Sequence, residues 1–73
     1  MNAKEWIAAY AERLGIDPPT AEEFDAILEL AAEAAHASDR TAAPVASWLT
    51  ARAGRSLDES RALARGITQH PEA

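Results

Sequence analysis

The chain has 73 residues, no cysteine and a net charge of −5 at pH 7. A chain of this length builds only one small core, which excludes two domains and predicts a single helical domain over residues 1–73. The missing cysteines exclude disulfides and thiolate metal sites, and they fit a reducing compartment. The acidic balance argues against a broad electrostatic grip on nucleic acid or on an anionic membrane.

The hydrophobic residues make up 48% of the chain, but 19 of them are alanines, which leaves only 16 larger side chains for a core. Charged residues interrupt every apolar run before it reaches the length of a signal peptide or a membrane span. We therefore expect a cytoplasmic protein with a thin core, for which a homodimer is an open alternative.

Capping signals divide the chain into helices. A small oxygen-bearing residue followed three positions later by glutamate is typical of a helix start, and it occurs at Asn2/Glu5, Thr20/Glu23 and Ser56/Glu59. The expected stops are Gly15, Gly54 and Pro71. We predict an all-α fold, a small bundle of four helices near residues 3–14, 21–38, 42–53 and 57–69. The connections are short, so successive helices should pack as neighbours.

Apolar residues recur at helical spacing in all four segments. The second segment has the widest apolar arc, so we expect it to be the central and most buried helix. The residues predicted to face the core are Ala3, Trp6, Ile7, Tyr10 and Leu14 in the first helix; Phe24, Ile27, Leu28, Leu30, Ala31, Ala34 and Ala35 in the second; Ala42, Val45, Leu49 and Ala53 beside Trp48 in the third; and Leu57, Leu63, Ala64 and Ile67 in the fourth.

Charge is divided unevenly along the chain. Residues 1–39 carry nine acids and two bases, whereas residues 40–73 carry five arginines and three acids. A solvated surface explains most of this pattern. The alternative is that the arginines form a local patch for an anion or an acidic partner, and they are Arg40, Arg52, Arg55, Arg61 and Arg65.

No combination of residues predicts catalysis. The only histidines are His36 and His70, too few and too far apart in the sequence for a metal site. Glu29 and Glu33 share a helix face, but an exposed acidic stripe is more often solubilising than an acid and base pair. The sequence also has no nucleophile elbow and no phosphate loop. We expect no enzyme, no catalytic residue, no metal and no cofactor.

The most informative stretch joins the second and third helices. His36 and Arg40 are expected one helical turn apart on the line of Glu29 and Glu33, where two bases near a helix end would relieve acid repulsion and complement the helix dipole. The alternative is that His36 and Arg40 face a groove and hold a carboxylate or a phosphate, with Pro44 fixing the entry to the third helix.

The same stretch carries a resemblance to a known family. The specific part is the string His36-x-x-x-Arg40-x-Ala42-Ala43-Pro44, and the weaker matches are Trp6, Leu14-Gly15-Ile16, Leu28-x-Leu30-Ala31, Trp48-Leu49 and Ala53-Gly54. The chain resembles a small actinobacterial-type helical domain of unknown function, found alone or fused to proteins like molybdenum cofactor guanylyltransferase (molybdopterin-guanine dinucleotide biosynthesis protein A). The resemblance implies a link to molybdenum cofactor maturation by association of domains.

Two hypotheses for function follow. The first is a non-enzymatic accessory or protein-interaction module that docks a protein, such as a molybdenum cofactor nucleotidyltransferase, through the surface around Trp48 and the 36–44 corner. The alternative is a small module that binds an anionic ligand such as a phosphate, a nucleotide or a pterin at His36 and Arg40. A buried Trp48 beside a concave corner would favour the ligand, and a flat corner with exposed apolar residues would favour docking.

Overall fold

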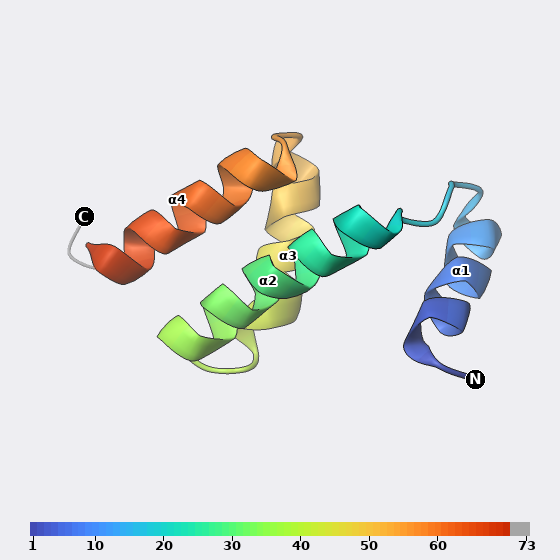
Figure 1. Ribbon diagram of the computed structural model, residues 1–73, viewed down its shortest axis with the longest axis horizontal. Coiled ribbons are helices and arrows are strands. Elements are labelled where there is room, and N and C mark those ends of the chain that lie inside the picture. The colour runs from blue at the N-terminus through green and yellow to red at the C-terminus, as the bar shows by residue number, and fades with distance from the viewer. Residues whose placement is uncertain (71–73) are drawn as a thin grey trace.

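The computed structural model describes residues 1–70 and confirms an all-α fold, a small bundle of four helices (Figure 1). The helices are α1 (Ala3–Leu14), α2 (Ala21–Ala37), α3 (Ala42–Ala53) and α4 (Leu57–Gln69). These bounds match the predicted ones except that α2 ends one residue earlier, because Ser38 leaves the helical conformation. The expected stop at Pro71 lies outside the described residues.

The three predicted caps form. The Asn2 side chain accepts a hydrogen bond from the Glu5 amide at 2.8 Å, and the Ser56 hydroxyl accepts one from the Glu59 amide at 3.1 Å. Only Thr20 and Glu23 form the reciprocal box, in which each side chain accepts from the amide of the other residue. These contacts satisfy amides that a helix cannot pair internally, so they fix where each helix begins.

Two glycines end helices in the left-handed conformation. Gly15 follows α1 with φ +77° and Gly54 follows α3 with φ +71°. Side chains with a Cβ adopt this region at a cost, so glycine is the residue that lets the chain reverse there. Gly54 therefore sets the direction in which α4 leaves α3.

Replacing two of the glycines with alanine should change the free energy of unfolding in opposite directions. Gly54→Ala should lower the free energy of unfolding by about 1–2 kcal/mol because a Cβ is strained at its positive φ. Gly66→Ala should raise it by about 0.5–1 kcal/mol because Gly66 lies inside α4. An added Cβ meets nothing within 4 Å at either position, so backbone conformation alone separates the two variants. Urea unfolding measures both, and equal effects of one sign would contradict this explanation.

α2 is the centre of the packing, as predicted. Both α3 and α4 pack against it, and Leu30 is the most buried large side chain of the described residues, at 3% exposed. α1 lies beyond one end of α2, away from the other two helices (Figure 1). The expectation that successive helices pack side by side is therefore wrong for α1, because the proline linker turns α1 away from the axis of α2. It is also wrong for α3 and α4, which both pack against α2 instead of against each other.

α3 packs with small residues instead of its large ones. Its half-buried residues are Ala42, Ala43, Ala46, Ser47 and Thr50. Val45, Trp48 and Leu49, which the apolar pattern predicted on the core side, are 55–58% exposed. Small side chains let two helices approach closely, so α3 lies against α2 with its alanine face and turns its bulky face outward.

In α4, too, the residues predicted to face the core differ from those that are buried. Leu63 and Ile67 were expected in the core but are 57% and 67% exposed. The buried residue of α4 is Ser60, at 9% exposed, and Leu57 and Ala64 are half-buried beside it. The small side chains of Ser60 and Ala64 lie one turn apart and allow α4 to pack close to α2.

Ion pairs and hydrogen bonds reinforce the contact between α2 and α4. Arg61 pairs with Glu29 of α2 and with Asp58 of its own helix, the latter at 2.8 Å. Its carboxylate partners raise the pKa of the Arg61 guanidinium above its usual value, and the hydrogen bond that Arg61 donates to Asp58 contributes most. One turn further along α2, Glu33 accepts a hydrogen bond from the Thr68 hydroxyl of α4 at 3.0 Å. Two carboxylates of α2, those of Glu29 and Glu33, thus have partners on α4.

α1 touches the rest of the chain with the face opposite its aromatic residues. Lys4 and Ile7 lie beside the prolines of the linker and Phe24, and the Lys4 ammonium is 5.5 Å from the centre of the Phe24 ring. Trp6 and Tyr10, predicted to face the core, are instead 54% and 50% exposed. The aromatic face of α1 consequently has no cover within the described chain.

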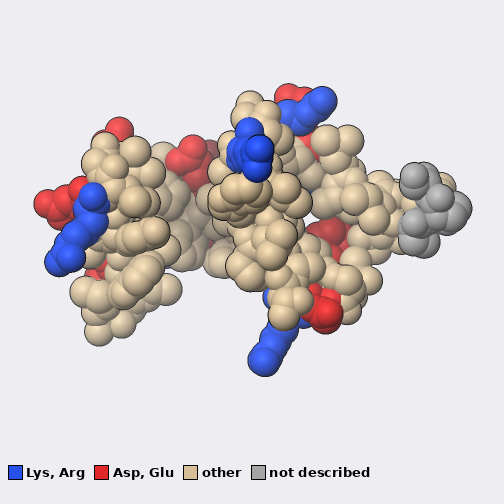
Figure 2. Space-filling model, turned by 180° about the vertical axis from the view of Figure 1, so that it is seen from behind, with Lys and Arg blue, Asp and Glu red and all other residues tan. Residues whose placement is uncertain are grey.

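The molecule is long for its size. It measures 40 × 23 × 18 Å and its radius of gyration is 13.1 Å, compared with about 11 Å for a compact domain of this length. α1 accounts for this shape, since it forms a separate lobe when the molecule is seen from behind (Figure 2). Within residues 1–70, none of the helices combines the length and the apolar character that a membrane crossing requires.

Candidate functional site

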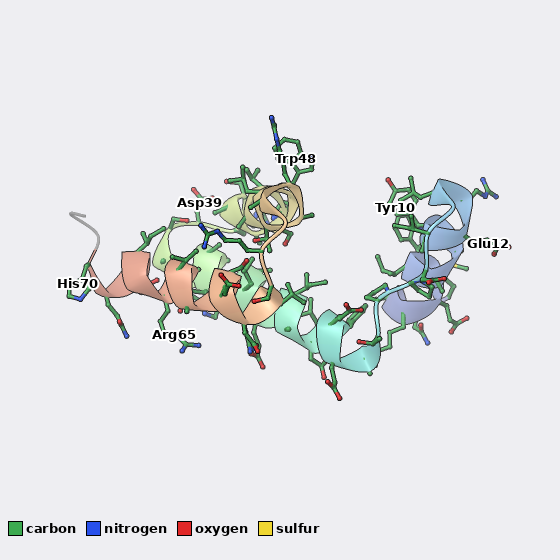
Figure 3. All side chains as sticks on the ribbon, turned by 90° about the horizontal axis from the view of Figure 1, so that it is seen from above. Tyr10, Glu12, Asp39, Trp48, Arg65 and His70 are labelled. Carbon is green, nitrogen blue, oxygen red and sulfur yellow. The ribbon has the colours of Figure 1, made fainter. Side chains whose placement is uncertain are left out.

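The outer side of α3 carries an exposed apolar surface. We call it the Trp48 surface, and it consists of Val45, Trp48, Leu49 and Arg52. Its three apolar members are each more than half exposed, because the opposite face of α3 makes the contact with α2. Figure 3 shows Trp48 projecting from α3, away from α2 and α4.

Arg52 holds the indole of Trp48 in place. The Arg52 guanidinium carbon lies 5.1 Å from the centre of the Trp48 ring, one helical turn further along α3. A guanidinium over an indole face makes a cation–π contact, which at an exposed site contributes about 0.5–1 kcal/mol. Tryptophan and arginine are also the side chains most enriched at energetically important positions of protein interfaces.

The 36–44 corner is an exposed turn. His36 lies in the last turn of α2, and the helix ends after Ala37. Ser38 closes that end by donating its hydroxyl to the carbonyl of Ala34 at 2.8 Å. Arg40 therefore lies in the turn, and the prediction that it continues the helical line of His36 is wrong. The reason is that Ser38 and Asp39 have left the helical conformation before Arg40 is reached.

Asp39 organises this turn, which the sequence analysis missed. Its carboxylate accepts hydrogen bonds from both the hydroxyl and the amide of Thr41, the amide at 2.9 Å. These bonds, the hydroxyl first, lower the pKa of the Asp39 carboxyl below its ordinary value. An aspartate that accepts from the amide two residues further on forms an Asx turn, a role for which aspartate is one of the favoured residues. Pro44 follows in the first turn of α3, where its missing amide costs no helical hydrogen bond.

The arginines do not gather into one patch. Arg61 and Arg65 face the carboxylates of α2, Arg55 pairs with Glu59 at 3.4 Å, and Arg52 lies over Trp48. Three of the five arginines are thus occupied by acids of the same chain. This arrangement favours the solvated-surface interpretation over a shared anion site.

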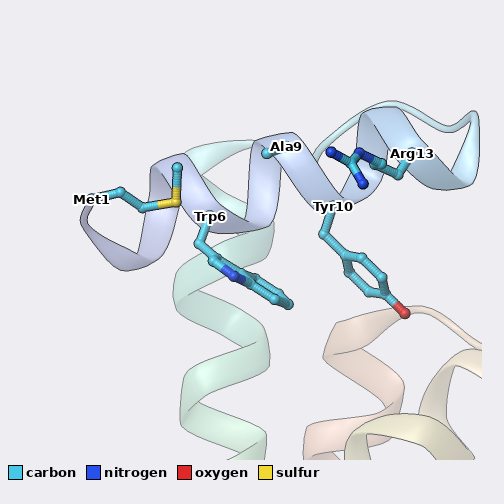
Figure 4. Close-up of a pocket in the computed structure, with 5 residues that line it drawn as sticks. All are labelled: Met1, Trp6, Ala9, Tyr10 and Arg13. Atoms are coloured by element: carbon cyan, nitrogen blue, oxygen red, sulfur yellow. The ribbon is translucent and has the colours of Figure 1, made fainter.

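The clearest hollows of the described surface lie away from the corner. One, of about 370 Å³, lies between α2, α3 and the start of α4. Its lining comprises Ile27, Leu30, Ser47, Thr50, Ala51, Gly54, Arg55 and Leu57. A second, of about 440 Å³, lies on the side of α1 from which Trp6 and Tyr10 project (Figure 4), and its lining comprises Met1, Trp6, Ala9, Tyr10 and Arg13. Neither is lined by His36, Arg40, Pro44 or Trp48.

These features define a small all-α domain whose large apolar side chains lie mostly on its surface. The chain belongs to the family described as a domain of unknown function, DUF6457, whose family model matches residues 1–72. This confirms the resemblance to a helical domain of unknown function. No curated protein and no solved structure matches the chain.

Proposed function

We propose that the protein is a non-enzymatic accessory module that docks a protein partner through the Trp48 surface. The observation that carries this proposal is the exposure of Trp48, at 58%, on a helix whose other face is already packed. Apart from its contact with Arg52, the ring of Trp48 is uncovered by its own chain, so it is available to anchor a partner. Val45 and Leu49 extend the apolar area around it, and Arg52 provides a polar edge.

The corner supports docking more than ligand capture. His36 and Arg40 are both exposed, and the clearest hollows lie elsewhere on the surface. Small-molecule sites are concave and enclose most of their ligand. An exposed turn beside an apolar helix face is better suited to a protein surface, for which His36 and Arg40 would supply charged contacts at the rim.

For the partner we propose a nucleotidyltransferase of molybdenum cofactor biosynthesis, the one that forms molybdopterin guanine dinucleotide. This part rests on the resemblance of the string from His36 to Pro44. Such a partner would present an apolar patch with acidic groups at its rim, complementary to Trp48 and Arg52.

The test is a binding measurement with the purified nucleotidyltransferase from the same cell. We expect Trp48→Ala to weaken binding by about thirtyfold, the loss typical of a tryptophan that anchors an interface. Trp6→Ala is the matched control, since Trp6 is exposed to a similar extent on α1, and it should leave this affinity unchanged. Equal affinities of the wild type and the Trp48 variant would overturn the proposal. Titration of the wild type with inorganic phosphate or GMP tests ligand capture, and saturable binding lost on replacing His36 and Arg40 would support that alternative instead.

A further inference from the structure

We infer that the protein forms a homodimer through the aromatic face of α1, which we call the α1 face: Met1, Trp6, Ala9, Tyr10 and Arg13. In this dimer the α1 face of one copy lies antiparallel against the α1 face of the other. The inference concerns a different surface from the Trp48 surface, so it does not depend on the function proposed above.

The α1 face is uncovered for a structural reason. Each residue turns an α-helix by about 100°, so Lys4 and Ala11 lie roughly 140–160° around α1 from Trp6. Ala11 is 5% exposed and Lys4 lies over Phe24, so this opposite side is the one that attaches α1 to the chain. α1 cannot turn Trp6 inward without giving up these contacts.

The aromatic residues on the α1 face are arranged as a unit. The rings of Trp6 and Tyr10 lie 5.2 Å apart and are tilted by 33°, and both project from the same side of the helix (Figure 4). Between them and Arg13 the small side chain of Ala9 leaves a hollow of about 440 Å³. A bulky ring from another molecule can enter where alanine leaves room.

The chain exposes more surface than a compact monomer of its mass would. The accessible surface of the chain is 5827 Å², compared with about 4,400 Å² for a compact monomer of this mass. The excess of about 1,400 Å² belongs to the whole chain, the Trp48 surface included, and it leaves room for an interface of standard size, in which each partner loses about 800 Å². Of the 16 larger hydrophobic residues, 11 are exposed, and three of them, Met1, Trp6 and Tyr10, lie together on the α1 face.

The charged residues of α1 favour a second copy of the chain as the partner of the α1 face, and they favour an antiparallel arrangement of the two helices. Glu5 and Arg13 lie four residues before and four residues after Ala9, and neither forms an ion pair within residues 1–70. A two-fold axis at Ala9 places Arg13 of each copy opposite Glu5 of the other. A parallel arrangement would instead bring like charges together, so the antiparallel dimer is the self-complementary one.

Sedimentation velocity of the full chain over roughly 1–100 µM tests the dimer, since interfaces of this size dissociate in that range or below it. The wild type should sediment as a species of twice the 7.8 kDa chain mass. Trp6→Ala should raise the dissociation constant by about thirtyfold, and Ala9→Glu, which sets two carboxylates against each other on the axis, should abolish the dimer. Trp48→Ala is the matched control and should sediment as the wild type does.

A charge exchange tests the antiparallel direction. Arg13→Glu should weaken the dimer by at least about tenfold, and adding Glu5→Arg to the same chain should restore it, because both pairs then re-form with reversed sign. A monomeric wild type at the highest concentration overturns the inference, as does a dimer that Trp48→Ala disrupts and Trp6→Ala does not. A dimer that Arg13→Glu weakens but the double exchange fails to restore overturns the antiparallel arrangement. Unchanged helical circular dichroism in each variant shows that association, and not folding, has been altered.

Discussion

Leu30→Ala should lower the free energy of unfolding by about 2–5 kcal/mol, the cost of removing a buried leucine from a packed core. Leu30 is only 3% exposed and lies in α2, against which both α3 and α4 pack. A domain of this size has a total stability of roughly 4–11 kcal/mol, so the loss is a large part of it. Urea unfolding followed by far-ultraviolet circular dichroism measures the change.

Leu28→Ala is the matched control for this variant. Leu28 belongs to the same helix and undergoes the same change, but it is 55% exposed. Leucine and alanine differ little in helix propensity, so the difference between the two variants isolates burial. We expect Leu28→Ala to cost less than about 1 kcal/mol. Similar losses in both variants would show that α2 is not packed as described.

Ser60→Leu should destabilise the protein by about 1–3 kcal/mol, through the opposite mechanism. Ser60 is 9% exposed on the side of α4 that faces α2, where a small side chain allows the two helices to approach. A leucine there must push α4 away, which also strains the pair between Arg61 and Glu29. Thermal unfolding should show a lower midpoint and a broader transition.

Ser60→Ala separates size from polarity. Alanine keeps the close approach of α4 to α2 and removes only the hydroxyl, so the variant should stay within about 0.5 kcal/mol of the wild type. If the alanine variant loses as much as the leucine variant, the hydroxyl and not the small volume is what Ser60 contributes.

The candidate site could be predicted from the sequence only in part. Trp48 was singled out as part of the surface around the 36–44 corner, and the structure shows it exposed. Asp39 was missed even though its contact with Thr41 spans only two residues. The α1 face was missed for a different reason: the pattern of Trp6 and Tyr10 correctly indicates an apolar stripe, but a stripe does not state which molecule covers it.

By itself, the sequence determined where the helices begin and end. The caps at Asn2, Thr20 and Ser56 and the left-handed glycines act over a few residues, so their effect is already present in the local sequence. The predicted and observed bounds therefore agree to within one residue.

Only the tertiary structure decided which side of each helix is buried. The apolar pattern favoured Val45 and Leu49 in α3 and Leu63 in α4, yet α2 packs against the faces that carry small residues. Burial depends on the fit of two helices together, and here the close approach that small residues allow decides which faces meet. The bulky side chains were left on the surface because a chain of 73 residues has too few elements to cover them.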